Sequence, residues 1–475
     1  MSITLSLFGD VAVDLPLRGV SIDSRTIRPG ELFAAVRGDR FDGHDFIDQA
    51  VAAGCAALLV ERLPARLPPV PVVRVDDVLH ALGEAAHTWR NRVNPLVLAV
   101  TGSCGKTTVK EMLTRCLQQR FTTVHATRGN LNNHIGLPLT LLAMPDHCQA
   151  LVVELGMSGA GEIAHLARMA RPQIGIITNV LPAHLEAFDS VDAIVEAKGE
   201  LLEALPADGL AIIPSGQPYT ARLRQKAGSV KVLTCGLDAS ADVYGTPSTA
   251  DRQPADPAQP DAESASITAF RIHWQVEQDE VEARLAHHGA HMRQNALAVA
   301  AAARTAGVTL AQIAAGLDLF APPVGRGGIR RAPQGWRVVD DSYNANPGSV
   351  RAALFSLPEP QKPGRRIAIL GDMLELGKEA ELLHRELYQA VLDNGIALLF
   401  TAGPLMQALH QAVEERATQE TDRPIEAWHR LDPAQWLGHI TPHLRPEDVV
   451  LVKGSRGMKM ERIVDNLVAG QQNAL

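Results

Sequence analysis

The sequence predicts an α/β protein of three domains, with a central phosphate-loop domain built on a parallel sheet and a Rossmann-like C-terminal domain. Short apolar runs alternate with segments of helical periodicity along most of the chain, which is typical of βαβ units. Proline-containing breaks separate three groups of these elements. The 475 residues agree with this division, since domains average roughly 150 residues.

Residues 1–93 are predicted to form a small α/β domain. Apolar runs at 32–36 and 56–60 surround a helical stretch near 45–53. A helix is expected over 78–90, and the pair Asn94-Pro95 then interrupts the pattern. We therefore place the first boundary after residue 93.

Residues 94–320 are predicted to form the central domain, with a largely parallel sheet covered by helices on both faces. Residues 246–266 are rich in Pro, Ala and Asp and contain almost nothing to bury, so we expect a solvated or disordered insertion there. An alanine-rich helix is expected over 291–306. The expected strands are 96–100, 151–154, 174–178, 210–213 and 230–233.

Residues 321–475 are predicted to form the C-terminal domain, after a linker that contains Pro322, Pro323 and three glycines. Helical segments separate its apolar runs, which favours an open Rossmann-like sheet. The expected strands are 336–340, 366–370, 398–401 and 449–453.

Composition and charge exclude several classes of protein. With 45 basic and 53 acidic residues the net charge is −8, which argues against a general nucleic-acid binder. The five cysteines show neither zinc spacing nor a disulfide pattern. The N-terminus lacks the features of a signal peptide, and no apolar run reaches the ~18 residues of a membrane span. We expect a cytoplasmic monomer without a transmembrane segment.

The strongest local signal is the segment from Gly102 to Thr108, GSCGKTT, between an apolar strand and an amphipathic helix. Glycines in such a loop let backbone N–H groups surround phosphate oxygens, while a lysine reaches the outer phosphates and a hydroxyl binds Mg²⁺. Val100 stands where the full phosphate-loop pattern has its first glycine, so a plain glycine turn before a helix is the alternative. Cys104 is expected to contribute its backbone rather than act as a nucleophile.

Three further residues of the central domain are candidates for chemistry. Glu154 ends an apolar strand, at the edge of a parallel sheet where ligands bind. His184 lies on the loop after the next strand. Lys198 falls within the apolar stripe of the following helix, where a lysine is costly unless it is paired or chemically altered. An ordinary strand end, an inert loop histidine and a lysine that extends to solvent are the respective alternatives.

Polar loops follow three predicted strands of the C-terminal domain, at 340–347, 371–377 and 453–457. Asp, Ser, Asn and Pro also favour plain turns, which is the alternative for the first loop. Because the carboxyl ends of parallel strands meet at one edge, the three loops together predict a face turned towards the nucleotide.

These segments resemble the Mur ligase family over most of the chain, from about residue 19 to 461 except 246–266. The similarity rests on specific motifs, of which DDSYNANPGS and GDMLELG favour the members that add a dipeptide. The motifs are TGSCGKTT, GNLNNHIGLPLTLL, ELG with GEI, AHLEAF with EAKGE, DDSYNANPGS, GDMLELG and VKGSRG.

The resemblance implies an ATP-dependent ligase of peptidoglycan synthesis that joins D-alanyl-D-alanine to UDP-N-acetylmuramoyl-tripeptide through an acyl phosphate. It also implies Mg²⁺, a carbamate on Lys198, and a C-terminal domain that closes over the site. The implied catalytic residues are Lys106, His184 and Lys198, and the implied metal ligands are Thr107, Glu154, His184 and Lys198. The implied ATP-binding residues are Gly102, Ser103, Cys104, Gly105, Lys106, Thr107, Thr108, Asn295, Arg326 and Asp341. The implied substrate-binding residues are Ser24, Arg25, Asn133, Asn344, Lys453 and Arg456.

A non-catalytic scaffold role, which would survive Lys106→Ala, and two other activities remain open from the residues. One is another ligase of the superfamily, such as a folylpolyglutamate synthase, which shares the phosphate loop but not the substrate segments. The other is a phosphate-loop ATPase that hydrolyses ATP without ligation. An assay that offers each class of substrate in turn distinguishes them.

Overall fold

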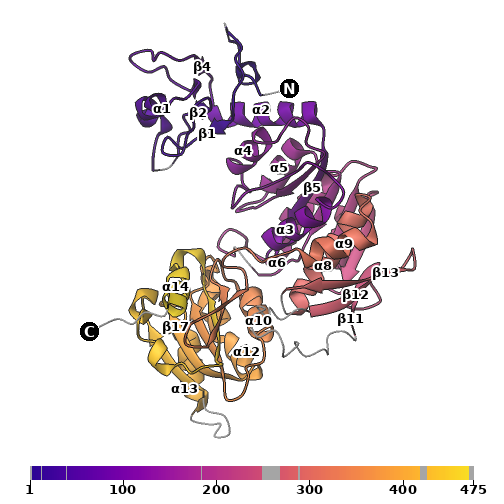
Figure 1. Ribbon diagram of the computed structural model, residues 1–475, viewed down its shortest axis with the longest axis vertical. Helices are drawn as coiled ribbons and strands as arrows, with labels where there is room; N and C mark the ends of the chain where they lie inside the picture. The colour runs from indigo at the N-terminus through magenta and orange to yellow at the C-terminus, as the bar shows by residue number, and fades with distance from the viewer. Residues whose placement is uncertain are drawn as a thin grey trace.

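The computed structural model describes residues 3–11, 13–38, 40–182, 185–248, 268–286, 289–417 and 425–469. Its strands form three sheets that follow one another along the length of the molecule (Figure 1). The predicted α/β fold with largely parallel sheets is therefore confirmed. None of the helices in these ranges combines the length and the apolarity that crossing a membrane requires.

The N-terminal sheet has four parallel strands in the order β1-β2-β3-β4. Residues of β2 and β3 are almost fully buried, as the two apolar runs predict. The elements are η1 (Leu5–Leu7), β1 (Val20–Ser21), β2 (Leu32–Ala34), η2 (Gly43–Phe46), α1 (Ile47–Ala52), β3 (Ala57–Val60) and β4 (Val72–Arg74).

Helix α2 (Val78–Val93) connects this sheet to the central one and packs against central helices α4 (Gly136–Leu142) and α5 (Glu162–Ala170). The Asp77 side chain caps its first turn, and Asn94 ends it in a left-handed conformation at φ 50°. The Trp89 indole donates to the Met144 carbonyl at 3.0 Å, and the Arg90 guanidinium donates to the Ala170 carbonyl at 2.8 Å. By these contacts α2 covers the central domain, although it precedes the boundary expected at residue 93.

The central sheet has nine strands in the order β13-β12-β11-β10-β9-β8-β5-β7-β6. Strand β5 lies between β7 and β8, and all three run parallel. The elements after α2 are β5 (Leu96–Thr101), α3 (Lys106–Leu117), β6 (Val124–Ala126), β7 (Ala150–Glu154), β8 (Ile174–Ile177), α6 (Val191–Glu203), β9 (Leu210–Pro214), α7 (Thr220–Lys226), β10 (Lys231–Gly236), β11 (Val243–Pro247), β12 (Thr268–Trp274), β13 (Asp279–Leu285), α8 (Ala290–Thr305) and α9 (Leu310–Asp318).

Alternate side chains of β5 enter two different cores, because successive residues of a strand point to opposite faces. Val97 and Ala99 pack with α2 and α4 on one face. Leu98 and Val100 pack with α3 and α8 on the other. Helices therefore cover both faces, as a buried parallel sheet requires.

One edge of the central sheet departs from the prediction. Strands β12 and β13 pair antiparallel with each other, and β12 pairs antiparallel with β11. Thr246 and Pro247 belong to β11 and Ser248 is buried, so the start of the expected insertion at 246–266 is structured. That part of the prediction is wrong because the three residues pair with or pack beside β12. Residues 249–266 lie outside the described residues.

The C-terminal sheet has six strands in the order β14-β15-β19-β16-β17-β18, of which only β14 is antiparallel to its neighbour. This matches the predicted open Rossmann-like sheet. The elements are β14 (Gly328–Arg331), β15 (Arg337–Asp341), α10 (Pro347–Phe355), β16 (Arg366–Gly371), η4 (Gly377–Glu379), α11 (Ala380–Arg385), α12 (Leu387–Asp393), β17 (Ile396–Ala402), α13 (Gln407–Ala417), β18 (Glu426–Arg430), η5 (Pro433–Trp436), η6 (Thr441–His443), β19 (Val449–Lys453), η7 (Arg456–Met458) and α14 (Glu461–Ala469).

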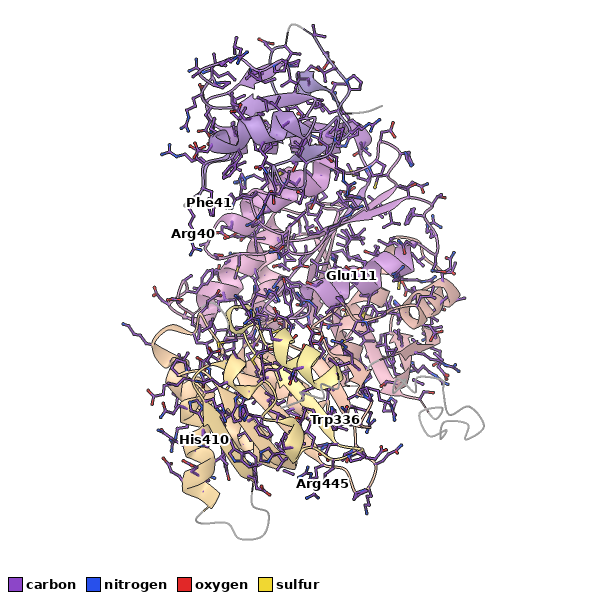
Figure 2. The ribbon with its side chains drawn as sticks, turned by 60° about the vertical axis from the view of Figure 1, so that its left-hand side comes forward. Arg40, Phe41, Glu111, Trp336, His410 and Arg445 are labelled. Carbon is purple, nitrogen blue, oxygen red and sulfur yellow. The ribbon has the colours of Figure 1, made fainter. Side chains whose placement is uncertain are left out.

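Aromatic side chains stabilise this last sheet on the face that α14 covers, opposite α10. The rings of Phe400 and Trp428 stack at 4.9 Å, and Trp436 meets Phe400 edge-on at 5.2 Å. Figure 2 shows the labelled Trp336 and His410 within the same domain, while Phe41, 72% exposed, lies on the N-terminal part of the chain.

Candidate functional site

The segment predicted as a phosphate loop connects the end of β5 to the start of α3. Gly102 has φ +149°, and a Cβ there would lie 1.9 Å from the Thr178 hydroxyl oxygen, so only glycine fits. Gly105 has φ +81° and lies against the side-chain amide of Asn295. Helix α3 starts without a side-chain cap, which leaves its first N–H groups for a ligand.

The end of β8 holds the middle of this loop. The Cys104 N–H donates to Asn179 Oδ1 at 2.9 Å, and the Ser103 N–H donates to the Asn179 carbonyl at 3.1 Å. The Cys104 carbonyl accepts from the Thr178 hydroxyl at 2.5 Å and from Asn179 Nδ2 at 3.2 Å. These two loop N–H groups therefore bind protein in this structure, whereas the first N–H groups of α3 have no side-chain cap.

The predicted metal ligands Thr107 and Glu154 lie in direct contact. The Thr107 hydroxyl donates to Glu154 Oε2 at 2.8 Å, and Asn132 Nδ2 donates to Oε1 at 2.8 Å. Lys106 Nζ donates to the Gly102 carbonyl at 2.7 Å. Burial lowers the pKa of the Lys106 ammonium, and the Glu154 carboxylate opposes that lowering.

Lys198 is buried, with only 2% of its surface exposed, and it lines the cavity beside the phosphate loop. A lysine that extends to bulk solvent is therefore excluded. Burial lowers the pKa of Lys198 well below its ordinary value, and the positive charge of Lys106 lowers it further. The amine is thus biased towards its neutral, nucleophilic form.

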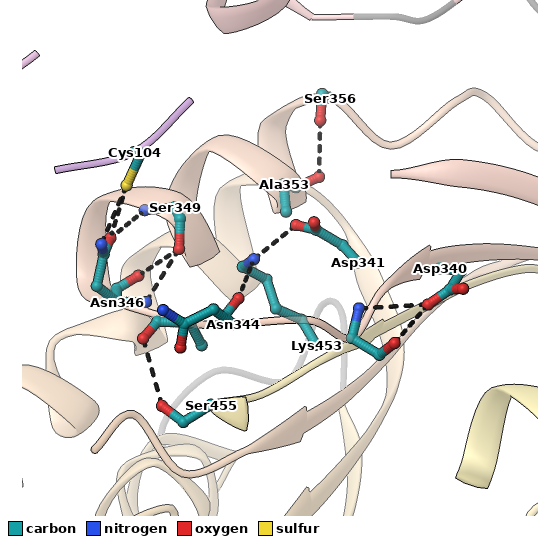
Figure 3. Close-up of polar contacts among 12 residues, drawn as sticks. Cys104, Asp340, Asp341, Asn344, Asn346, Ser349, Ala353, Ser356, Lys453 and Ser455 are labelled. Carbon is teal, nitrogen blue, oxygen red and sulfur yellow. Dashed lines mark hydrogen bonds and ion pairs between the residues drawn. The ribbon is translucent and has the colours of Figure 1, made fainter. Parts of the chain in front are cut away.

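The C-terminal domain presents charged groups to the loop from its own strand ends. Lys453, at the end of β19, donates to Asp341 Oδ2 at 2.6 Å and to the Asn344 carbonyl at 2.8 Å (Figure 3). The Arg326 guanidinium stacks on the Tyr343 ring at 4.1 Å. These contacts orient one acidic and two basic side chains towards the central domain.

A single cavity of about 640 Å³ joins these two sets of residues. It is lined by loop residues from Ser103 to Thr108, by Asn132 and Glu154 beside them, and by the three polar loops of the C-terminal domain. The prediction that those loops face the nucleotide segment is confirmed in its geometry. Of the predicted site residues, the lining includes Asn133, Lys198, Asn295, Arg326, Asp341, Asn344, Lys453 and Arg456.

Of the described residues, three predicted site residues do not line this cavity: Gly102, Ser24 and Arg25. His184 lies outside the described residues. Ser24 belongs to the N-terminal domain, where its hydroxyl donates to Gln49 Oε1 at 2.9 Å. Arg25 is exposed and paired with Asp23 at 2.7 Å, and this hydrogen bond lowers the pKa of Asp23 to about 2.

The N-terminal domain has a cavity of its own, of about 270 Å³. His44 lines it, with Nδ1 2.6 Å from Asp42 Oδ1 and Nε2 accepting from the Glu61 N–H at 3.0 Å. Arg62 pairs with Asp42 at 2.9 Å. His44, held by Asp42, therefore contributes to a polar hollow apart from the phosphate loop.

Three side chains that orient the site were not singled out from the sequence: Asn179, Tyr343 and Asn346. Tyr343 and Asn346 lie within a motif, but a motif does not show which of its members turn inwards. Asn179 follows a predicted strand, but only the structure shows that this strand, β8, lies beside β5.

The geometry fits a magnesium ion bound together with phosphates. Thr107 and Glu154 supply adjacent hydroxyl and carboxylate oxygens, the ligands that Mg²⁺ prefers. Within the described residues no cluster of three or more His, Cys, Asp or Glu side chains could hold a metal. Mg²⁺ usually takes few protein ligands and completes its shell with phosphate and water, so this sparse set suits it.

Comparison with known proteins agrees with this arrangement. Family models match residues 16–90 (Mur ligase family, catalytic domain), 100–303 (Mur ligase middle domain) and 325–456 (Mur ligase, glutamate ligase domain). The chain is 35% identical to the UDP-N-acetylmuramoyl-tripeptide--D-alanyl-D-alanine ligase of Escherichia coli, over 98% of each chain.

Two solved structures are also similar over nearly the whole length. MurF from Acinetobacter baumannii superposes with a TM-score of 0.82 at 30% identity, covering 97% of this chain and 94% of the other. MurF from Thermotoga maritima, solved in complex with ADP, gives 0.78 at 26% identity and covers 98% of each. With three family models in sequence order and a relative aligned from end to end, the chain belongs to the Mur ligase family.

Proposed function

We propose that this protein is an ATP-dependent ligase that joins D-alanyl-D-alanine to UDP-N-acetylmuramoyl-tripeptide in peptidoglycan synthesis. The observation that carries the proposal is the shared cavity, in which Lys106, Glu154 and Lys198 meet Asp341 and Lys453 of the C-terminal domain. The E. coli relative carries this activity in its name, and it aligns with all three domains of this chain.

ATP is the nucleotide that the central domain would bind. The free N–H groups at the start of α3 would hold its phosphates, with Lys106 moved from the Gly102 carbonyl onto the outer phosphates. Asn295, which lies against Gly105, would contact the base. Arg326 would approach the phosphates and Asp341 the ribose. The similarity to a structure solved with ADP supports this assignment.

Ligation needs activation because a carboxylate does not acylate an amine in water. The terminal carboxylate of the tripeptide attacks the γ-phosphorus of ATP, the bond to the β-phosphate oxygen breaks, and ADP leaves. The amine of D-alanyl-D-alanine then attacks the acyl carbon and loses a proton, and inorganic phosphate is expelled. The protein contributes positioning and positive charge, which are the main needs of phosphoryl transfer.

Mg²⁺ bound by Thr107 and Glu154, with a second ion near His184 and Lys198, would neutralise the charge on the phosphates. A neutral Lys198 amine would react with CO₂ to form a carbamate, which supplies the anion that the second ion needs. Burial of Lys198 supports this step because it favours the unprotonated amine. ¹³C NMR of protein in ¹³C-bicarbonate tests it: a carbamate signal that is absent from Lys198→Met is expected.

The three domains would divide the work, with boundaries near residues 93 and 320. The N-terminal domain would hold the UDP group, with Ser24 and Arg25 in that role. Asn133 would contact the substrate in the central domain, and Asn344, Lys453 and Arg456 would do so from the C-terminal domain. Closure of the C-terminal domain would exclude water from the acyl phosphate. Small-angle scattering should show a smaller radius of gyration when nucleotide and substrates are added.

Phosphate release with each substrate omitted in turn is the decisive experiment. The proposal expects release only when ATP, UDP-N-acetylmuramoyl-tripeptide and D-alanyl-D-alanine are all present. Release from ATP alone would instead favour a phosphate-loop ATPase. Release that depends on a folate and glutamate would favour a folylpolyglutamate synthase.

A further inference from the structure

The phosphate loop touches the C-terminal domain through the side chain of Cys104. Its Sγ lies 3.0 Å from Asn346 Nδ2 and 3.3 Å from Asn346 Oδ1 (Figure 3). The two residues are 242 positions apart and belong to different domains. Of the five cysteines, all in the described part of the chain, Cys104 alone is partly exposed.

Both sides of this contact are held in place. The Cys104 peptide is hydrogen-bonded on both its N–H and its carbonyl by Thr178 and Asn179, which directs the side chain away from β8. Asn346 caps α10, since its Oδ1 accepts from the Ser349 N–H at 2.9 Å. The cap fixes Oδ1 as the acceptor, so Nδ2 faces the sulfur as a donor.

A second line of contact supports the same docking. The Ser103 hydroxyl donates to the Leu181 carbonyl and accepts from the Leu181 N–H, both at 2.9 Å. Gly348, in the first turn of α10, lies against Leu181, because a Cβ there would be 2.7 Å from Leu181 Cδ1. The start of α10 therefore contacts the phosphate loop directly at Cys104 and indirectly through Leu181.

We propose that Asn346 is a positioning residue, whose side-chain amide couples the phosphate loop to the closed position of the C-terminal domain by its contact with the Cys104 thiol. The coupling follows from the geometry, because both residues are held by their own domains, so any movement of one domain relative to the other changes the distance between the Cys104 thiol and the Asn346 amide. The role of Asn346 in catalysis rests on the proposed ligase function, whereas its contact with Cys104 does not.

Two substitutions separate this role from capping. Cys104→Ala removes the sulfur and leaves the cap intact. Asn346→Ser keeps a good N-cap residue but shortens the side chain, so the amide donor to the sulfur is lost. Asn346→Ala loses both the cap and the contact, and its melting temperature relative to Asn346→Ser reports the cap alone.

We expect Cys104→Ala and Asn346→Ser each to lower kcat/KM for D-alanyl-D-alanine about 3- to 10-fold, the worth of one modest hydrogen bond. The dissociation constant of ADP should change by less than about 2-fold, because the backbone of the loop is untouched. The double variant should be no worse than either single variant, since both remove the same contact. Multiplied effects in the double variant, or an equal loss of ADP affinity, would overturn the proposal.

A second measurement needs no substrate and so stands apart from the ligase assignment. Asn346→Ser should increase the rate at which N-ethylmaleimide alkylates Cys104 by about 3-fold or more, because the amide no longer covers the sulfur. The four buried cysteines serve as internal controls in the mass spectrum. An unchanged rate would show that the contact does not persist in solution. Increased alkylation without the kinetic change would support the contact but refute the coupling. If the protein without substitutions showed no turnover with all three substrates, the ligase function would be refuted instead.

Discussion

The central cavity and the N-terminal hollow differ in how they are built. The cavity lies where the ends of β5, β7 and β8 meet the strand ends of a second parallel sheet, so polar groups from distant segments converge on it. Within the described part of the chain, the hollow beside His44 is lined by residues 44, 45, 47, 48 and 62–65. Convergence of many strand ends suits a reaction centre, whereas a local polar hollow suits the holding of one end of a substrate.

This contrast predicts different kinetic effects for substitutions in the two regions. Changes in the cavity should remove turnover or metal dependence, because the groups there would act on the transferred phosphate. Changes in the N-terminal domain should weaken substrate binding and leave turnover at saturation nearly intact.

The largest effect is expected from Lys106→Ala, which removes the cation proposed to bind the outer phosphates. Turnover should fall by at least about 10³-fold, given the weight of charge stabilisation in phosphoryl transfer. Phosphate release with all three substrates measures this, and Lys231→Ala, at an exposed lysine of β10, is the matched control. If Lys106→Ala kept a tenth of the activity, the proposed role of this cavity residue in phosphoryl transfer would be contradicted.

Glu154→Gln should come next, because it weakens a metal ligand while preserving shape. The Mg²⁺ concentration for half-maximal rate should rise about 10²-fold, in line with the loss of a charged group at a metal site. A magnesium titration at saturating ATP gives the value. Glu277→Gln, at an exposed turn, should leave the titration unchanged.

Lys198→Met should stabilise the protein in CO₂-free buffer by about 1–4 kcal/mol at neutral pH, as replacement of buried charged groups by apolar ones often does. Because burial lowers the folded pKa of Lys198 below the ordinary 10.5, the unfolded chain binds the proton more tightly. The free-energy penalty of burying the protonated Lys198 is therefore fully present below its folded pKa and disappears as pH rises towards 10.5. Urea unfolding over that range should show the gain shrinking, with none for Lys231→Met.

The smallest effect is expected in the N-terminal domain. Arg25→Ala should raise KM for UDP-N-acetylmuramoyl-tripeptide about 3- to 10-fold, since it removes one exposed cation proposed to bind the UDP group. KM for ATP should stay constant, and so should both constants in Arg28→Ala, at a nearby exposed arginine. A fall in kcat for Arg25→Ala would contradict the division between the two regions.

Much of the site could be predicted from local sequence. The phosphate loop needs only a strand, two glycines, a lysine and a helix in order, and Glu154 needs only the end of an apolar run. The contacts of Asn179 and Asn346 could not be predicted in this way, because they depend on β8 lying beside β5 and on α10 docking across two domains. Chain order does not specify either neighbour.

The edge strands of the central sheet were missed for a different reason. Strand β13 reads Asp-Glu-Val-Glu-Ala-Arg-Leu, and only Ala283 and Leu285 within it are buried. Its first residues lack the continuous apolar signal of a central strand, because an edge strand covers the core with one face only. Strand β13 therefore forms mainly because it pairs with β12, and its own residue pattern contributes less.

The segment that connects the central and C-terminal domains determines with which domain Arg326 would move. Gly325 donates to Asp340 Oδ2 at 3.2 Å, Gly327 donates to the Asp340 carbonyl at 2.7 Å, and Arg326 stacks on Tyr343. These contacts attach Arg326 to the end of β15, so a hinge for the proposed closure would lie upstream of residue 325. In that closure Arg326 would move with the C-terminal domain, and it would reach a nucleotide only in the same movement that brings Lys453.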